Sequence, residues 1–303
     1  MPKPDLSVSI AGVTFKNPVT TASGTFGSGM EYSEFVDLNR LGAVTTKGVA
    51  SSPWEGNPVP RVTEVYGGML NAIGLQNPGV EVFVKRDLEF LKQFDTRVIV
   101  NVCGRTEEEY LAVVERLAGE AVDLLEINVS CPNVKEGAIA FGQDPDALFR
   151  ITDKIRRIAS QPVIMKLTPN VTSIAEMARA AEAGGADAIS LINTITGMKI
   201  DIERRTFVLA NKTGGMSGPA IKPVAVRMVW QAARAVKIPI IGMGGIASAE
   251  DAIEFILAGA TMVAAGAMQF HNPCLTMEII DGIEAYMVRH QIEHVTDLIG
   301  TVQ

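Results

Sequence analysis

The chain of 303 residues has the length of two average domains or of one large α/β barrel. Its net charge of −7 disfavours binding to the phosphate backbone of nucleic acids. The sequence contains neither the apolar core of a secretory signal nor a run of 18 apolar residues, so we expect a cytoplasmic protein without a membrane span.

Short apolar runs recur along the chain, each followed by a polar or glycine-containing turn. Continuously apolar runs are typical of strands buried on both faces, as in parallel sheets. The runs span residues 19–23, 43–47, 98–102, 124–129, 163–167, 188–193, 239–243 and 261–266. Eight strand–helix units and no linker predict a single (β/α)8 TIM barrel domain over residues 1–303.

The segments around these runs carry signals of their own. A hairpin is predicted over residues 8–15 and is expected to close the bottom of the barrel. Helices are predicted over 107–119, 173–183 and 249–257, the first of them capped by Thr106 and followed by acidic residues. Long insertions that include residues 67–79 and 197–219 follow two strands and are expected on the C-terminal face, where barrels build active sites.

The predicted strands end in polar or small residues, and the carboxyl ends of barrel strands converge on one axis. Loops that begin there explain a serine or an asparagine, but not lysines at the ends of two buried runs, because a buried lysine is costly without an anion. The strand-end residues are Ser23, Lys47, Asn101, Asn128, Lys166, Asn193, Thr194, Gly244, Gly245, Gly266 and Ala267. We expect this ring to bind a planar, polar, electron-accepting group.

Glycines after the last two predicted strands indicate a phosphate site. The segment GMGGIA at 242–247 matches half of the dinucleotide fingerprint, but no acidic residue follows at the distance needed to bind a ribose. Backbone N–H groups in such loops bind one phosphate rather than a pyrophosphate. A mononucleotide such as FMN therefore suits the sequence better than NAD, and no P-loop for ATP is present.

Three cysteines, without a C-x-x-C pair, are too few for a four-cysteine iron–sulfur site. Cys131 lies just past a predicted strand, on a loop that could act as a lid, and general base, nucleophile and redox thiol remain open as its roles. Cys103 and Cys274 are expected to be inert. His290 and His294 lack a third ligand, so we expect a surface pair on the last helix and no metal site.

These segments together resemble the dihydroorotate dehydrogenase family over essentially the whole chain. The matching motifs are TASGTFG (21–27), TTKG (45–48), NAIGLQNPG (71–79), NVSCPN (128–133), MKLTPN (165–170), INT (192–194), GGMSGPAIKP (214–223) and GMGGI (242–246). NAIGLQN and NVSCPN in this order are highly specific. The resemblance implies an FMN-containing (β/α)8 barrel that oxidises (S)-dihydroorotate to orotate in pyrimidine biosynthesis.

Cys131 is similar to the base of the soluble class 1 enzymes, and residues 210–223 resemble the type B subfamily. Type B implies a catalytic subunit that passes electrons to NAD+ through a partner subunit carrying FAD and a [2Fe–2S] cluster, in a heterotetramer of two catalytic and two electron-transfer subunits. Alternatives left open are a type A homodimer that uses fumarate, another FMN barrel acting on dihydropyrimidines, a barrel that binds a sugar phosphate, and a regulatory binding protein.

The resemblance also implies individual roles, with Cys131 taking the C5 proton while the C6 hydride goes to flavin N5, and with Lys166 near flavin N1 and O2. The implied substrate contacts are Lys47, Asn71, Ala72, Ile73, Gly74, Leu75, Asn128, Asn193 and Thr194. The implied FMN contacts are Ser23, Thr46, Lys47, Asn101, Asn128, Lys166, Ile192, Gly218, Gly244, Gly245, Gly266 and Ala267.

Overall fold

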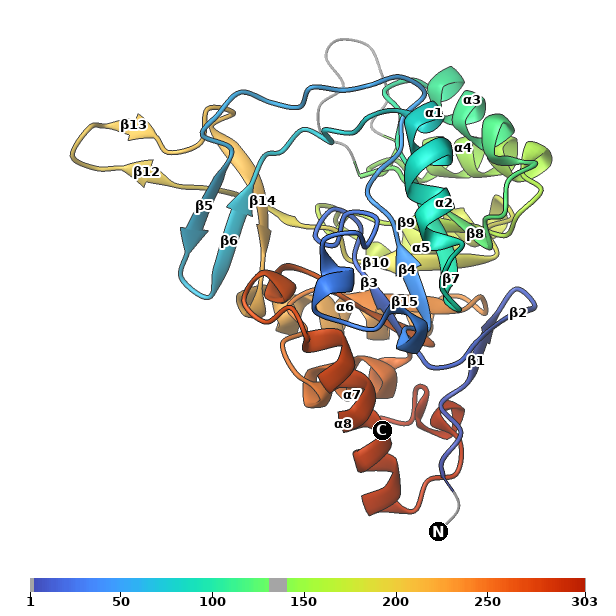
Figure 1. The fold of residues 1–303 in the computed structure, drawn as a ribbon. Coiled ribbons are helices and arrows are strands. Elements are labelled where there is room, and N and C mark those ends of the chain that lie inside the picture. Colours follow the sequence, from blue (N-terminus) through green and yellow to red (C-terminus); the bar gives the residue numbers. More distant parts are fainter. Residues whose placement is uncertain (1–2, 131–140, 303) are drawn as a thin grey trace.

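A computed structural model describes residues 3–130 and 141–302, and its elements are arranged as in Figure 1. The central sheet has eight parallel strands, in the spatial order β3-β16-β15-β10-β9-β8-β7-β4. They are β3 (Val19–Thr21), β4 (Ala43–Thr45), β7 (Arg97–Val102), β8 (Leu124–Asn128), β9 (Val163–Lys166), β10 (Ala188–Leu191), β15 (Ile240–Met243) and β16 (Met262–Ala265). Each predicted run overlaps one of these strands, with β7 beginning one residue before its run, and the predicted (β/α)8 barrel is confirmed.

The two edge strands, β3 and β4, meet through threonine side chains. Thr21 Oγ1 accepts a hydrogen bond from the backbone N–H of Thr45 (3.0 Å) and donates one to the backbone oxygen of Thr45 (3.2 Å). The hydroxyls of Thr20 and Thr45 lie 3.0 Å apart. Because an open strand edge leaves backbone groups without partners, these buried hydroxyls satisfy the edge and close the barrel.

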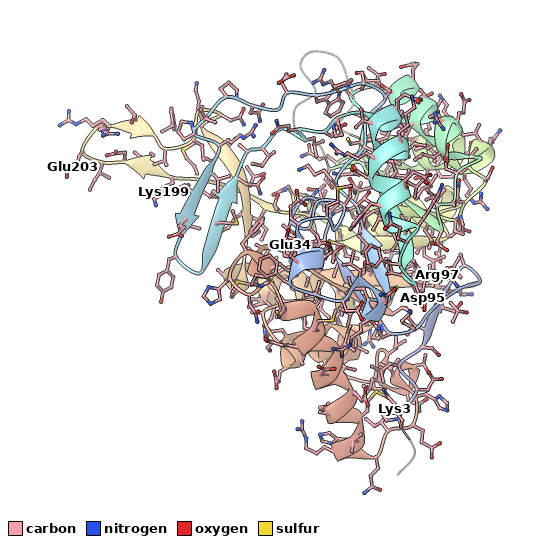
Figure 2. All side chains as sticks on the ribbon, viewed as in Figure 1. Lys3, Glu34, Asp95, Arg97, Lys199 and Glu203 are labelled. Atoms are coloured by element: carbon pink, nitrogen blue, oxygen red, sulfur yellow. The ribbon has the colours of Figure 1, made fainter. Side chains whose placement is uncertain are left out.

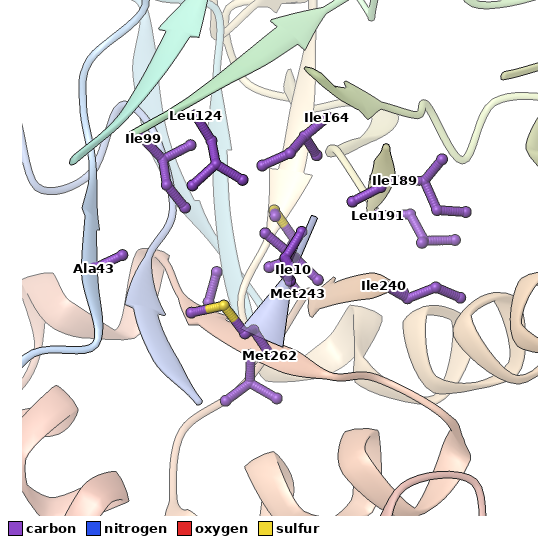
Figure 3. Close-up of a cluster of buried hydrophobic side chains, with 14 of the residues drawn as sticks. Ile10, Ala43, Ile99, Leu124, Ile164, Ile189, Leu191, Ile240, Met243 and Met262 are labelled. Carbon is purple, nitrogen blue, oxygen red and sulfur yellow. The ribbon is translucent and has the colours of Figure 1, made fainter. Parts of the chain in front are cut away.

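The strands are buried on both faces, which accounts for their continuously apolar sequences. Figure 3 shows apolar side chains of neighbouring strands meeting in one cluster, among them Ile99, Leu124, Ile164, Ile189 and Met262. All five are fully buried. Packing of branched side chains from adjacent strands is the usual core of such a barrel.

The three predicted helices are present, the first with its expected cap. Helix α3 (Glu107–Leu117) follows Thr106, whose hydroxyl accepts from the N–H of Glu109. Helices α5 (Ile174–Ala183) and α7 (Ala249–Ala258) are capped by serines in the same way. Three further helices cover the barrel: α4 (Pro145–Ile158), α6 (Lys222–Ala233) and α8 (Leu275–His290). Within the described ranges, no helix has the length and apolar character needed to cross a bilayer.

Two units depart from the predicted strand–helix pattern. Between β3 and β4 the described chain forms two short 3₁₀ helices, Tyr32–Glu34 and Leu38–Arg40, in place of an α-helix. Glycines with positive φ at positions 24, 27 and 29 precede them and disfavour a continuous helix. After β4, a π-helical segment (Phe83–Leu88) separates two single turns, α1 (Val80–Val82) and α2 (Glu89–Leu91).

The predicted hairpin is present as β1 (Val8–Ile10) and β2 (Val13–Phe15). Ile10 and Phe15 are fully buried in the main core. Arg97, at the amino end of β7, donates from Nε to the backbone oxygen of Thr14 (3.0 Å), and Figure 2 places Arg97 and Asp95 side by side there. The hairpin therefore lies at the amino ends of the strands, as expected.

The two insertions join in a second sheet that the sequence analysis did not anticipate. Strands β5 (Val62–Val65), β6 (Gly68–Asn71), β11 (Ile195–Met198) and β14 (Thr213–Ser217) pair in the antiparallel order β11-β14-β6-β5. Strands β12 (Ile200–Asp201) and β13 (Thr206–Phe207) form a hairpin that projects from it (Figure 1), and Figure 2 labels Lys199 and Glu203 on this projection. The pairing brings segments far apart in sequence to the carboxyl ends of the barrel strands.

Candidate functional site

A cavity of about 510 Å³ lies between the carboxyl ends of the barrel strands and the four-stranded sheet. Its size is in the usual range for a small-molecule site. Both insertions contribute to its wall, for example through Asn71 of β6 and Thr213 of β14. The expected placement of the insertions around the mouth of the barrel is confirmed for the residues that the structure describes.

Nearly all candidates within the described residues line this one cavity. The substrate candidates in its wall are Lys47, Asn71, Ala72, Ile73, Gly74, Leu75, Asn128, Asn193 and Thr194. The cofactor candidates in its wall are Ser23, Lys47, Asn101, Asn128, Lys166, Ile192, Gly218, Gly244, Gly245, Gly266 and Ala267. Strand ends that are dispersed in the sequence therefore meet at one site.

Two candidates stand apart from this group. Thr46 is fully buried, is not part of the cavity wall, and accepts a hydrogen bond at Oγ1 from the N–H of Asn101 (3.4 Å). Its side chain thus supports the neighbouring strand, and its contact with a cofactor stays a prediction. Cys131 lies outside the described residues. Ser130 and Gly142, close to either side of the undescribed segment, both line the cavity.

Lys47 is a largely buried cation in the cavity wall. Burial lowers the pKa of its ammonium group below the ordinary value, the Cys103 thiol opposes this shift, and repulsion by Arg61 adds to it. Among the described residues, no carboxylate pairs with Lys47 Nζ within 4.0 Å. A buried cation in this setting favours an anionic ligand.

Lys166 has one partner in the cavity wall and one buried beneath it. Its Nζ donates to Ser23 Oγ (3.0 Å) and lies 3.6 Å from Oε1 of Glu126. Glu126 also accepts from Asn101 Nδ2 (2.6 Å) and from Ser190 Oγ (2.7 Å). Glu126 and Ser190 were not predicted from the sequence, although a carboxylate inside the apolar run LLEIN was itself a signal.

Asparagine amides form a second polar group in the wall. Asn193 Nδ2 donates to Asn128 Oδ1 (3.3 Å), and Asn193 Oδ1 accepts from the N–H of Thr194 (2.8 Å). Asn170, which the sequence analysis did not single out, donates from Nδ2 to the backbone oxygen of Thr194 (3.1 Å) and lines the same cavity. Such amides offer both donors and acceptors to a ligand.

The glycines after β15 and β16 make a close approach between loops. Gly244 and Gly245 have positive φ values of 129° and 78°. A Cβ atom on Gly245 would lie 2.7 Å from the backbone oxygen of Gly218 and 2.9 Å from the backbone nitrogen of Lys222. Asp251 holds this loop, because its carboxylate accepts from the N–H of Ala247 (2.8 Å) and from Lys222 Nζ (2.7 Å).

The other two cysteines and the histidines are not part of the cavity wall. Cys103 is buried, whereas Cys274 is exposed. The expectation of a histidine pair on the last helix is wrong, because α8 ends at His290 and Gln291 has a left-handed backbone conformation. His290 packs against the ring of Tyr286, and His294 lies 3.5 Å from Asp5. Within the described ranges, no cluster of three or more metal-binding side chains is found.

The chain is similar in sequence to proteins of a known family. The family profile described as "Dihydroorotate dehydrogenase" matches residues 5–287. A protein of Lachnoclostridium phytofermentans named "Dihydroorotate dehydrogenase B (NAD(+)), catalytic subunit" is 73% identical over 297 residues, which covers 98% of this chain and 99% of the relative. A protein of Alkaliphilus oremlandii with the same name is 61% identical over 300 residues, covering 99% of each.

The fold is also shared with a solved structure. A crystal structure of DHODH from Eimeria tenella in complex with ferulenol has a TM-score of 0.82, covering 98% of this chain and 88% of that one. At 24% identity this likeness shows the fold alone. The family profile and the two relatives match nearly the whole chain. The chain therefore belongs to the dihydroorotate dehydrogenase family.

Proposed function

We propose that this chain is the catalytic subunit of an NAD+-linked dihydroorotate dehydrogenase, which oxidises (S)-dihydroorotate to orotate in pyrimidine biosynthesis. The observation that carries the proposal is the cavity at the carboxyl ends of the strands, where two lysines and several asparagine amides meet. Dihydroorotate is a cyclic ureide with a carboxylate, so it needs a cation together with groups that both donate and accept hydrogen bonds.

The residues present fit FMN. Asn101 Oδ1 is buried in the wall without a hydrogen-bond partner among the described residues, which suits a ligand that donates an N–H. Gly244, Gly245 and Gly266 line the cavity, and their backbone N–H groups are expected to bind a phosphate. Lys166 is expected to stabilise negative charge on the ring. When bound, FMN supplies the acceptor for the hydride that leaves C6 of the substrate.

Lys47 and the amides are proposed to hold the substrate. The Lys47 ammonium, which lacks a paired carboxylate among the described residues, is expected to bind the substrate carboxylate. Asn71, Asn128 and Asn193 are expected to bind the ureide, and the backbone of residues 72–75 together with Thr194 completes the pocket. These groups would hold the ring in place for removal of the C5 proton and the C6 hydride.

Cys131 is proposed as the base that takes the proton from C5. It lies outside the described residues, but Ser130 just before this segment and Gly142, two residues after its end, line the cavity. A thiolate within reach of C5 would remove the proton as the hydride leaves C6, and the thiol then returns the proton to solvent.

We further propose that the chain acts as a single FMN-binding domain in the cytoplasm, within a heterotetramer of two catalytic and two electron-transfer subunits. The partner would carry FAD and a [2Fe–2S] cluster. The relatives' description as NAD+-linked catalytic subunits supports this proposal. The test is co-expression with the candidate partner and purification by a tag on this chain alone. Co-purification with dihydroorotate-dependent reduction of NAD+ is expected, whereas fumarate turnover by the isolated chain would indicate a type A enzyme.

A further inference from the structure

Glu126 is a buried carboxylate beneath the cavity that the proposed function leaves without a role. Its side chain is 1% exposed and it does not line the cavity. Three polar partners surround it, two on the adjacent strands β7 and β9 and one on β10, the strand beyond β9. They are Asn101 Nδ2 at 2.6 Å, Lys166 Nζ at 3.6 Å and Ser190 Oγ at 2.7 Å. Asn101 and Glu126 are direct cross-strand neighbours, and so are Lys166 and Ser190.

The chemistry of this cluster fixes the orientation of Asn101. An ionised carboxylate only accepts hydrogen bonds, so Asn101 must turn its NH₂ group toward Glu126. Its Oδ1 is thereby left as an acceptor in the cavity wall, buried and without a partner among the described residues. A glutamine at position 126 could donate as well as accept, and it would allow either orientation of the Asn101 amide.

The same carboxylate determines how much positive charge Lys166 presents. The side chains of Lys166 and Glu126 are 5% and 1% exposed, so water screens their interaction weakly. Among the described residues, Glu126 is the carboxylate that pairs with Lys166. Replacing it with a neutral amide of the same shape would leave the lysine charge uncompensated.

We propose that Glu126 is a positioning residue that sets the redox potential of FMN, by orienting Asn101 and by partly neutralising Lys166. This inference rests on the proposed function, because it requires FMN in the cavity. The reduced cofactor carries more negative charge than the oxidised cofactor. Removal of the Glu126 charge should therefore stabilise the reduced form and make the potential more positive.

The test measures the redox potential of FMN bound to the full-length chain, in the wild type and in the Glu126→Gln variant. Loss of a full charge from a site screened by protein is expected to change the reduction equilibrium by about tenfold, or about 30 mV for a two-electron couple. Ser190→Ala is the matched control, because it removes a hydrogen bond from Glu126 and keeps the carboxylate. Its potential is expected to remain at the wild-type value.

A more positive FMN potential in Glu126→Gln, with an unchanged potential in Ser190→Ala, supports the inference. An unchanged potential, or an equal shift in Ser190→Ala, overturns it, because the charge of Glu126 would then have no separate effect. If Glu126→Gln purifies without flavin, Glu126→Asp replaces it, and its longer distance to Lys166 should give a smaller shift in the same direction. An unchanged potential in Glu126→Asp would also overturn the inference. A wild-type chain that binds no FMN would contradict the proposed function itself.

Discussion

The buried ammonium group of Lys47 is expected to make orotate binding depend on pH. Burial lowers its pKa, so it loses its proton at a lower pH than an exposed lysine. Only the protonated form attracts a carboxylate, and orotate affinity is therefore expected to fall as pH rises through this lowered pKa. The measurement is the orotate dissociation constant of the FMN-loaded chain as a function of pH.

Lys47→Met is the control for this dependence. The variant should bind orotate about tenfold or more weakly at neutral pH, as expected for loss of a hydrogen bond to a charged group, and its affinity should no longer change over the same pH range.

In the ligand-free chain, the effect of pH on folding stability has the opposite sign to its effect on orotate affinity. The unfolded chain binds more protons at Lys47 between the two pKa values, so its contribution to folding stability rises with pH. A wild-type orotate affinity that stays flat up to pH 10.5 would contradict this role.

Cys131 is expected to limit turnover through its thiolate. An ordinary thiol has a pKa of about 8.5, so the rate should rise with pH as the thiolate forms. Cys131→Ser should lower dihydroorotate oxidation about 100-fold at neutral pH, in the range typical of a lost general base. Bound FMN, measured by visible absorbance, should stay at the wild-type level. Full activity in this variant would assign the base to another group.

At this scale the strand-end residues were predicted from the rule that strand ends of a barrel meet, and the other site residues from the family resemblance. Lys47, Asn128 and Lys166 were found in this way and do line one cavity. Glu126 was missed because it lies two residues before the end of β8, inside a run that was predicted to be core. Thr46 was expected to contact FMN, and this stays a prediction; its side chain lies outside the cavity wall and bonds to the neighbouring strand, a tertiary contact that no local pattern reveals.

At the scale of elements, the loop after β15 depends on glycine. A Cβ on Gly245 would collide with backbone atoms of Gly218 and Lys222, and its positive φ disfavours any other residue. Gly245→Ala is therefore expected to weaken FMN binding at least about tenfold, because the loop must shift. Gly119→Ala is the matched control, since a Cβ there meets no atom within 4 Å. FMN titration of both variants checks the prediction, and equal affinities would refute it.

The threonine seam between β3 and β4 makes a prediction about stability. Thr21→Val keeps the side-chain shape but leaves the N–H and carbonyl of Thr45 without their partner. Each buried group left unsatisfied costs about 1–3 kcal/mol, so the free energy of unfolding should fall by about 2 kcal/mol or more. Thr14→Val, on the exposed hairpin, should change it by less than about 0.5 kcal/mol. Urea unfolding measures both, and similar values would argue against a seam closed by hydroxyls.

Elements with strong local signals were predictable, and those defined by distant pairing were not. The capped helices α3, α5 and α7 begin within one residue of the predicted positions, because the caps are local. The four-stranded sheet was missed because β6 and β14 contain glycines and pair across more than 140 residues, as Asn71 does with Gly215. A helix was also predicted between β3 and β4, but the glycines of that segment favour turns.

At the scale of the whole molecule, the closed barrel and the added sheet together enclose the cavity. The strand ends provide the cations and amides at the mouth, and the insertions wall off the space above them. The fold class followed from eight buried runs in one chain. The shape of the cavity did not, because it depends on insertions whose pairing partners lie far apart in sequence.

The central claim is that this mouth holds a flavin which dihydroorotate reduces. The most direct measurement is anaerobic mixing of the purified, FMN-loaded chain with dihydroorotate, followed by visible absorbance, with dihydrouracil as the matched substrate that lacks the carboxylate. We predict that dihydroorotate bleaches the flavin absorbance rapidly and that dihydrouracil does not. A chain that takes up no flavin, or a bound flavin that dihydroorotate leaves oxidised, would contradict the account.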